Sequence, residues 1–231
     1  MSKPLASLVR WLAALAVVLF LPASNVLLLM RPAFVSFEYS LPGFPPSDRF
    51  DPQTRLYWAQ ESVRYLLEPD DAALLREGRH ISQFQIAGQP VYNQRELQHM
   101  YDVKGVLGGL IWVWRVTGLL LVAGLAVALW RREVRPPLAR GILLGGVLLV
   151  GLIVAILLSA LLNFDSFFTH FHEVFFKGNS WLFYYSDSLI QFYPLPFWMD
   201  ATYILGGLSL LEGLVLGGIS FVYLRHREVR K

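Results

Sequence analysis

Four long runs of apolar residues constrain the fold of this chain more than any other feature of its sequence. They cover about residues 11–30, 106–130, 141–163 and 201–224. Each is long enough to cross a hydrocarbon layer of about 30 Å, for which a helix needs roughly 20 residues. A small soluble domain rarely buries a helix as uncharged as GILLGGVLLVGLIVAILLSALL on every face. Because 55% of all residues are hydrophobic, we predict an α-helical membrane protein with four transmembrane helices.

Charge is distributed unevenly over the segments outside these runs. The segments 1–10, 131–140 and 225–231 together carry a net charge of +8, whereas 31–105 and 164–200 together carry −5. Lys and Arg near the ends of membrane spans stay on the cytoplasmic side. We therefore expect both termini in the cytoplasm and the two acidic segments outside the cell. The basic side chains lie at helix ends instead of forming a patch among exposed aromatic residues, which argues against nucleic-acid binding.

These two patterns divide the chain into seven segments. The order is a cytoplasmic N-terminus and first span (1–30), an extracellular cap (31–105), a second span (106–130), a basic cytoplasmic loop (131–140), a third span (141–163), an aromatic-rich extracellular segment (164–200), and a last span with a cytoplasmic tail (201–231). The first run lacks an obvious small-residue cleavage site, so we expect it to be retained as an anchor.

The cap is long enough to fold, and we expect a small mixed α/β structure. Proline, glycine and aspartate predict a loop at 37–52, and apolar residues at helical spacing predict a helix at 54–68. Alternation around a glycine predicts a short hairpin within 80–93. Asn93 and Glu96 form a capping-box pattern that starts a helix leading into the second span.

Two charged residues fall inside the predicted spans. Arg115 lies about nine residues into the second span and Glu212 about eleven into the fourth, and both spans run from outside to inside. Isolated charges are costly in a membrane and usually paired. We therefore predict an ion pair between Arg115 and Glu212; the alternative is that Arg115 extends to the membrane surface on its own.

The segment 164–200 holds 14 of the 33 aromatic residues of the chain. An interfacial belt explains Trp and Tyr at a membrane surface, but it does not require the six Phe between 164 and 176. The composition therefore favours an aromatic-lined surface in this segment.

Histidines and carboxylates are the candidate catalytic groups of the outer segments. Glu96, His99 and Asp102 are spaced three apart and share one helix face, so either carboxylate could orient His99. The same spacing also fits a solvated helix face without function. The chain has no cysteine, which excludes thiolate metal sites and disulfides.

The string THFHEVFF contributes two more histidines, His170 and His172. Together with His99 and Glu173 they could form a metal site, but histidines two apart lack the i, i+4 spacing of the helical zinc motif. A metal-free pair of imidazoles that acts as acid and base needs fewer assumptions, since each titrates near neutral pH.

Three motifs resemble a known family, the bacterial lipoprotein intramolecular transacylases (Lit). They are E-x-x-H-M-x-D-V-K at 96–104, F-H-E-x-F-F-x-x-x-S-W at 171–181 and D-x-L-I-x-x-Y-P-x-x-F-W-x-D at 187–200, in this order among four spans. The resemblance implies four transmembrane helices under an extracellular cap, and two catalytic histidines that correspond to His99 and His172.

The resemblance also implies a reaction on a diacylated lipoprotein in a bacterial cell membrane. The acyl chain at the sn-2 oxygen of the diacylglyceryl group moves to the α-amine of the N-terminal cysteine and leaves a lyso-form lipoprotein. We expect His172 as base toward the amine, His99 as acid or oxyanion stabiliser, and Glu96, Asp102 and Glu173 in supporting positions. The sequence leaves the reverse assignment of the two histidines open. The walls of the substrate pocket should be Phe171, Phe175, Phe176 and Trp181.

We expect neither a metal nor another cofactor. We also expect no acyl-enzyme intermediate, because nucleophile and electrophile belong to one substrate molecule. Two alternatives remain. A metal-dependent membrane hydrolase predicts bound zinc and loss of activity with a chelator, and a non-enzymatic lipid- or lipoprotein-binding protein predicts that replacing either histidine leaves function intact.

Overall fold

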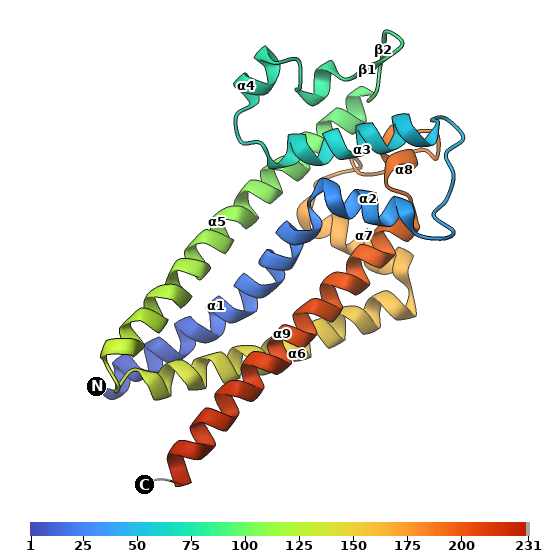
Figure 1. The fold of residues 1–231 in the computed structure, drawn as a ribbon. Coiled ribbons are helices and arrows are strands. Elements are labelled where there is room, and N and C mark those ends of the chain that lie inside the picture. Colours follow the sequence, from blue (N-terminus) through green and yellow to red (C-terminus); the bar gives the residue numbers. More distant parts are fainter. Residues whose placement is uncertain (230–231) are drawn as a thin grey trace. The chain divides into compact units, whose positions relative to one another are not determined.

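The computed structural model describes residues 1–229 and is mostly helical (Figure 1). The elements in chain order are α1 (Lys3–Leu29), α2 (Pro32–Ser40), α3 (Pro52–Leu67), α4 (Asp71–Arg76), the 3₁₀ turn η1 (Ile81–Gln83), β1 (Gln85–Ile86), β2 (Gln89–Pro90), α5 (Gln94–Trp130), α6 (Arg135–Leu162), α7 (Phe164–Phe175), α8 (Ser188–Phe192) and α9 (Leu195–Val229). The described part of the chain forms two compact units, the first from residues 1–26, 110–162 and 203–229, the second from 27–109 and 163–202.

Four helices, α1, α5, α6 and α9, are long and apolar enough to cross a membrane. They contain the four apolar runs of the sequence, except that α1 and α6 each end one residue earlier than predicted. Helix α5 begins twelve residues before the predicted second span, at Gln94 rather than 106. The expectation of four long apolar helices is therefore confirmed.

Glycines on α6 let the helices of the first unit approach closely. A Cβ added at Gly145 would lie 2.8 Å from the Ala14 carbonyl oxygen of α1, and one added at Gly146 would lie 2.7 Å from the Gly213 carbonyl oxygen of α9. Next to these contacts Val17, Leu21, Leu149 and Ile153 form a buried apolar cluster. Close packing at small residues is the usual way in which membrane helices associate.

The predicted ion pair between Arg115 and Glu212 is wrong. Within residues 1–229 the structure contains no ion pair of these two side chains, and Arg115 is exposed. Glu212 instead accepts a hydrogen bond of 2.9 Å from the Nδ2 amide of Asn25 on α1, which also donates to the Ser209 hydroxyl at 3.0 Å. The prediction rested on the similar depth of Arg115 and Glu212 along their helices. Depth alone does not determine whether the two side chains lie on helix faces that meet.

The second unit is mainly helical, so the mixed α/β cap was only partly right. Its strands pair antiparallel over two residues each around Ala87 and Gly88, both with positive φ as a tight hairpin turn requires. The predicted loop at 37–52 begins as helix, because Pro32 at the start of α2 favours a helix that runs to Ser40.

The predicted helix at 54–68 is present as α3. Asp51 caps it by accepting hydrogen bonds from the backbone N–H groups of Gln53 and Thr54. In this unit α3 packs against α2 and α8 (Figure 1), and the buried Arg55 guanidinium donates to the carbonyl oxygens of Gln191 and Pro45, each at 2.5 Å. These contacts fix the segment that leads from α8 into α9.

Gly145→Ala tests the packing of α6 on α1. We expect a loss of about 1–3 kcal/mol, because the added methyl group has no room without a shift of backbone. Gly151→Ala on the same helix is the matched control, since nothing lies within 4 Å of its added Cβ. Thermal unfolding in detergent measures both, and equal melting temperatures would contradict the packing described.

Candidate active site

His99 is positioned by the first turn of α5. The backbone N–H of Asn93 donates to Glu96 Oε2 at 2.9 Å, and the backbone N–H of Glu96 donates to Asn93 Oδ1 at 3.0 Å. This reciprocal pair is the predicted capping box, and it is confirmed. Because Glu96 and His99 are three residues apart, the cap and the imidazole lie on the same face of the helix.

The same carboxylate holds a second segment of the chain. Glu96 Oε1 accepts the backbone N–H of Leu189 at 2.8 Å, and Glu96 is only 1% exposed. Its burial raises the pKa of the carboxyl, while the two backbone hydrogen bonds act in the opposite direction. Glu96 thus joins the start of α5 to the start of α8.

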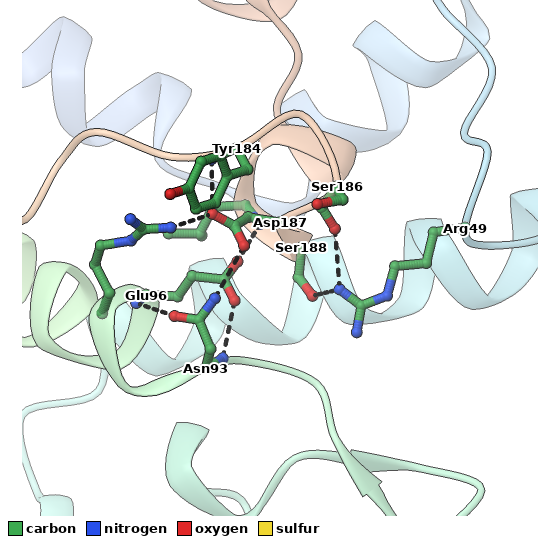
Figure 2. A network of polar contacts seen from close by, with 9 residues as sticks. Arg49, Asn93, Glu96, Tyr184, Ser186, Asp187 and Ser188 are labelled. Atoms are coloured by element: carbon green, nitrogen blue, oxygen red, sulfur yellow. Dashed lines mark hydrogen bonds and ion pairs between the residues drawn. The ribbon is translucent and has the colours of Figure 1, made fainter.

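Asp187 extends this junction into a network (Figure 2). Its carboxylate accepts hydrogen bonds from Asn93 Nδ2 at 3.0 Å, from Arg95 Nη2 at 2.8 Å and from the backbone N–H of Tyr184 at 2.8 Å. On the other side of the network Arg49 donates to the Ser186 carbonyl oxygen at 3.3 Å and to the Ser188 hydroxyl at 2.8 Å. The segment 184–188 is therefore fixed beside the first turn of α5.

His172 comes from α7, which Asn163 caps by accepting the backbone N–H of Ser166 at 3.0 Å. Aromatic residues at a spacing of four make one side of this helix apolar, and Phe164, His172 and the C-cap residue Phe176 are buried there. His170 points elsewhere, is exposed, and has its Nδ1 2.6 Å from the Ser166 carbonyl oxygen. The two-residue spacing on a helix separates the two histidines, as the sequence predicts for that case.

The hydrogen bond of His172 defines which of its nitrogens is a base. Nδ1 lies 2.7 Å from the carbonyl oxygen of Phe168. A carbonyl oxygen only accepts, so Nδ1 carries the proton and Nε2 of the neutral ring holds a lone pair. Burial lowers the pKa of His172, and the hydrogen bond to Phe168 raises it by less.

His99 lies beside His172, with ring centroids 6.1 Å apart and ring planes at 24°. It is 8% exposed, and its Nδ1 has no hydrogen-bond partner among residues 1–229. Burial lowers the pKa of His99 to about 4, with a further lowering from His172 and an opposing effect of Asp102. Both rings are therefore neutral at pH 7.

Aromatic side chains surround the two imidazoles. The ring of Phe176 lies 4.8 Å from that of His99 and 5.6 Å from that of His172, and Trp181 lies 5.0 Å from His172. Phe171 contacts His172 at 5.6 Å, whereas Phe175 packs on Phe171 and is half exposed. Three of the four predicted wall residues thus touch a histidine.

Two further aromatic residues beside the histidines were not among the predicted pocket residues. Phe168 lies 4.1 Å from the His172 ring and Phe183 lies 5.3 Å from the His99 ring. Phe168 precedes His172 by four residues, a spacing that could have revealed it. Arg95, which is paired with Asp187, lies over the ring of Phe183 at 5.6 Å and so helps to hold this ring beside His99. Nothing in the sequence pattern predicts this contact between distant residues.

Two of the predicted supporting carboxylates are bonded to groups other than the imidazole of His99. Glu96 binds backbone groups, and Asp102 accepts hydrogen bonds from Gln98 Nε2 at 2.9 Å and from the Ser180 hydroxyl at 3.4 Å. Neither is hydrogen-bonded to His99. Glu173 is exposed on α7 and takes no part in the cluster. Among residues 1–229 no three His, Asp or Glu side chains are arranged to hold a metal ion, so the four residues of the metal hypothesis do not meet.

Asp187→Asn tests the network. An amide in place of the carboxylate loses the charge that binds Arg95 and offers N–H groups where Oδ2 accepts two hydrogen bonds, so we expect a loss of about 1–3 kcal/mol. Asp48→Asn is the control, because that side chain is exposed. If thermal unfolding gives both variants the parent melting temperature, the network does not stabilise the fold.

The low pKa of His99 predicts a pH dependence of stability. Its value in the folded chain, about 4, lies below the ordinary value of 6.5, so between these values the unfolded chain binds more protons. Stability from this group is complete above pH 6.5 and is lost as pH falls toward 4. His99→Gln should therefore lose less stability than the parent between pH 6.5 and 4, relative to each protein at pH 8. If the melting temperatures of His99→Gln and of the parent fall equally as the pH is lowered from 6.5 to 4, the low pKa assigned to His99 is wrong.

Comparisons with known proteins agree with this architecture. A family model described as "Lipoprotein intramolecular transacylase Lit" matches residues 9–198. A protein of Aquifex aeolicus, described as uncharacterized, is 28% identical over 222 residues, which are 90% of this chain and 92% of that protein.

Solved structures share the fold. The in meso structure of the membrane integral lipoprotein intramolecular transacylase Lit from Bacillus cereus superposes with a TM-score of 0.73 at 16% identity and covers 100% of both chains. A structure of a histidine variant of that protein gives a TM-score of 0.64, also at 16% identity, over 99% of this chain and 97% of the other. The family and the four apolar helices support a bacterial membrane protein that is an acyltransferase. Since the family model covers most of its length, the chain belongs to the lipoprotein intramolecular transacylase Lit family.

Proposed function

We propose that this protein transfers the sn-2 acyl chain of a diacylated lipoprotein to the α-amine of its N-terminal cysteine. The C–N bond to the acyl carbon forms, the ester C–O bond breaks, and the proton lost by nitrogen ends on the glyceryl oxygen. The product is an N-acylated lyso-form lipoprotein. The reaction takes place at the outer face of the membrane, with both termini of the chain in the cytoplasm, as the charge distribution favours.

The observation that carries this proposal is the fixed tautomer of His172. Its Nδ1–H is bound to the Phe168 carbonyl oxygen, so Nε2 is available as a general base. A neutral amine becomes acidic as it attacks the carbonyl carbon, and a base of low pKa can then remove its proton. The imidazolium of His172 returns that proton to the glyceryl oxygen as the ester bond breaks.

His99 fits the role of oxyanion stabiliser better than that of acid. With a pKa of about 4 it is a neutral ring at pH 7, and an N–H of a neutral imidazole can polarise a carbonyl oxygen without losing its proton. In the transition state the attacking nitrogen and the carbonyl oxygen are bonded to the same carbon. His172 must come within about 3 Å of that nitrogen, and His99 within about 3 Å of that oxygen. Two rings 6.1 Å apart suit this requirement.

The aromatic surroundings supply the entropic part of catalysis. Attack closes a ring of about eight atoms through the cysteine and the glyceryl group, which is slow unless the substrate is held folded. Buried walls such as Phe176 restrict the substrate and exclude water from the reacting carbonyl. Exclusion of water also favours aminolysis of the ester over hydrolysis.

Replacing either histidine tests the proposal. We expect His99→Ala and His172→Ala to lower the rate of N-acyl product formation by a factor of about 100 or more, since each removes a group that acts on the reacting atoms. His170→Ala is the matched control, because it lies two residues from His172 on the same helix but is exposed. Mass spectrometry of the N-terminal peptide of a co-expressed lipoprotein measures the product.

The outcomes separate the candidate functions. Loss of product in both site variants with a normal His170→Ala supports the two-histidine mechanism. Near-parent amounts of product from either site variant refute it. A parent that yields free fatty acid instead of an N-acyl peptide would indicate a hydrolase.

A further inference from the structure

One buried polar group beside the two histidines, the indole N–H of Trp181, has no role in the two-histidine mechanism. The indole Nε1 of Trp181 is buried and has no hydrogen-bond partner within residues 1–229. Two other indoles are hydrogen-bonded: Trp114 Nε1 donates to the Ser24 hydroxyl at 2.9 Å, and Trp198 Nε1 donates to the Tyr193 carbonyl oxygen at 3.0 Å. Among the residues that the structure describes, Trp181 has the one buried indole N–H without a partner, and its ring contacts that of His172.

An unpaired indole N–H is costly. The group only donates, and leaving a buried donor unpaired costs about 1–3 kcal/mol. Native proteins seldom tolerate this unless a ligand or a function supplies the partner. The hydroxyl group of the neighbouring Ser180 donates to Asp102 and is not bonded to the indole N–H.

The position of Trp181 is built into the fold. A turn at Gly178, with φ of +69°, and a hydrogen bond of 3.2 Å from the Leu182 N–H to the Asn179 carbonyl oxygen reverse the chain after α7. The contact of Ser180 with Asp102 then ties this turn to α5, the helix that carries His99. The indole ring comes to lie 5.0 Å from the His172 ring, inclined by 31°.

We infer that the Nε1–H of Trp181 donates a hydrogen bond to the carbonyl oxygen of the acyl group in transfer. This inference rests on the proposed function and adds Trp181 to it as a catalytic residue. The substrate atoms near His172 are the amine nitrogen, the glyceryl oxygen and the ester carbonyl oxygen. The first two exchange a proton through His172, and the carbonyl oxygen gains negative charge and receives no proton.

An indole suits this third atom. Its N–H does not ionise near neutral pH, so it stabilises the oxyanion without forming a neutral alcohol. His99 Nδ1 is also buried and unpaired among the described residues, and one carbonyl oxygen can accept two hydrogen bonds. Trp181 and His99 together form the oxyanion hole, and His172 is the base.

The experiment compares Trp181→Phe with the parent in a purified assay on a diacylated lipopeptide in detergent. Phe keeps an aromatic ring and removes the N–H. We expect kcat to fall about 100-fold, the usual effect of losing one oxyanion donor, with KM changed less than about threefold. Because Phe is smaller than Trp, the melting temperature is compared for the benzothienyl variant described below, where it should stay the same or rise because an unpaired buried donor is gone.

Trp114→Phe is the control for the same chemical change at an indole that is already paired. It should lower the melting temperature and leave kcat near that of the parent. Should Trp181→Phe fail to fold, a benzothienyl analogue of tryptophan at position 181 replaces the N–H with sulfur and preserves both rings. The same loss of kcat is expected from it.

Three results overturn the inference. A kcat within about threefold of the parent means that Trp181 is only a wall of the pocket. A fall in melting temperature of the benzothienyl variant means that Nε1 is bound to the protein. A parent that forms no N-acyl product refutes the proposed function itself, which separates that failure from the other two.

Discussion

The candidate site depends on one buried carboxylate. Glu96 uses one oxygen to cap its own helix and the other to bind the backbone of Leu189, so it fixes both the direction of α5 and the place of the segment before α8. His99 follows one turn later on α5, and Phe183 and Tyr184 lie in that segment. If Glu96 were lost, both sides of the His99 environment would lose their common support.

This arrangement explains why both imidazoles are neutral. In many enzymes a carboxylate holds the catalytic histidine and raises its basicity. Here Glu96 and Asp102 are bonded to backbone, amide and hydroxyl groups, and His172 is oriented by the uncharged Phe168 carbonyl oxygen. The aromatic rings then lower both pKa values by excluding water. A neutral pair suits a reaction in which one group accepts a proton and another stabilises an oxyanion.

Local patterns predicted much of the fold. Hydrophobic runs located the four long helices, and the spacing of Asn93 and Glu96 identified the cap of α5, because both depend on residues close in sequence. Contacts between distant segments were not accessible in this way. The partner of Glu212 is Asn25 and not Arg115, since the rotation of each helix about its axis depends on packing at residues such as Gly145.

For the candidate site, too, sequence motifs predicted some features, whereas contacts between distant segments could not be predicted. The pairing of His99 with His172 rests on the family motifs, and the structure places the two rings side by side. Spacing suggested that Glu96 or Asp102 orients His99, but each accepts a hydrogen bond from a distant segment instead, 93 and 78 residues further along the chain. Hydrogen-bond partners of this kind could not be predicted from one sequence.

The most direct test of the account is the protonation state of the two rings in the resting enzyme. It can be measured by ¹⁵N NMR on protein labelled at histidine, with signals assigned by the His99 and His172 variants. We predict two neutral rings at pH 7, with His172 protonated on Nδ1 and unprotonated on Nε2. An imidazolium signal from either ring at pH 7, or a His172 ring protonated on Nε2 alone, would contradict it.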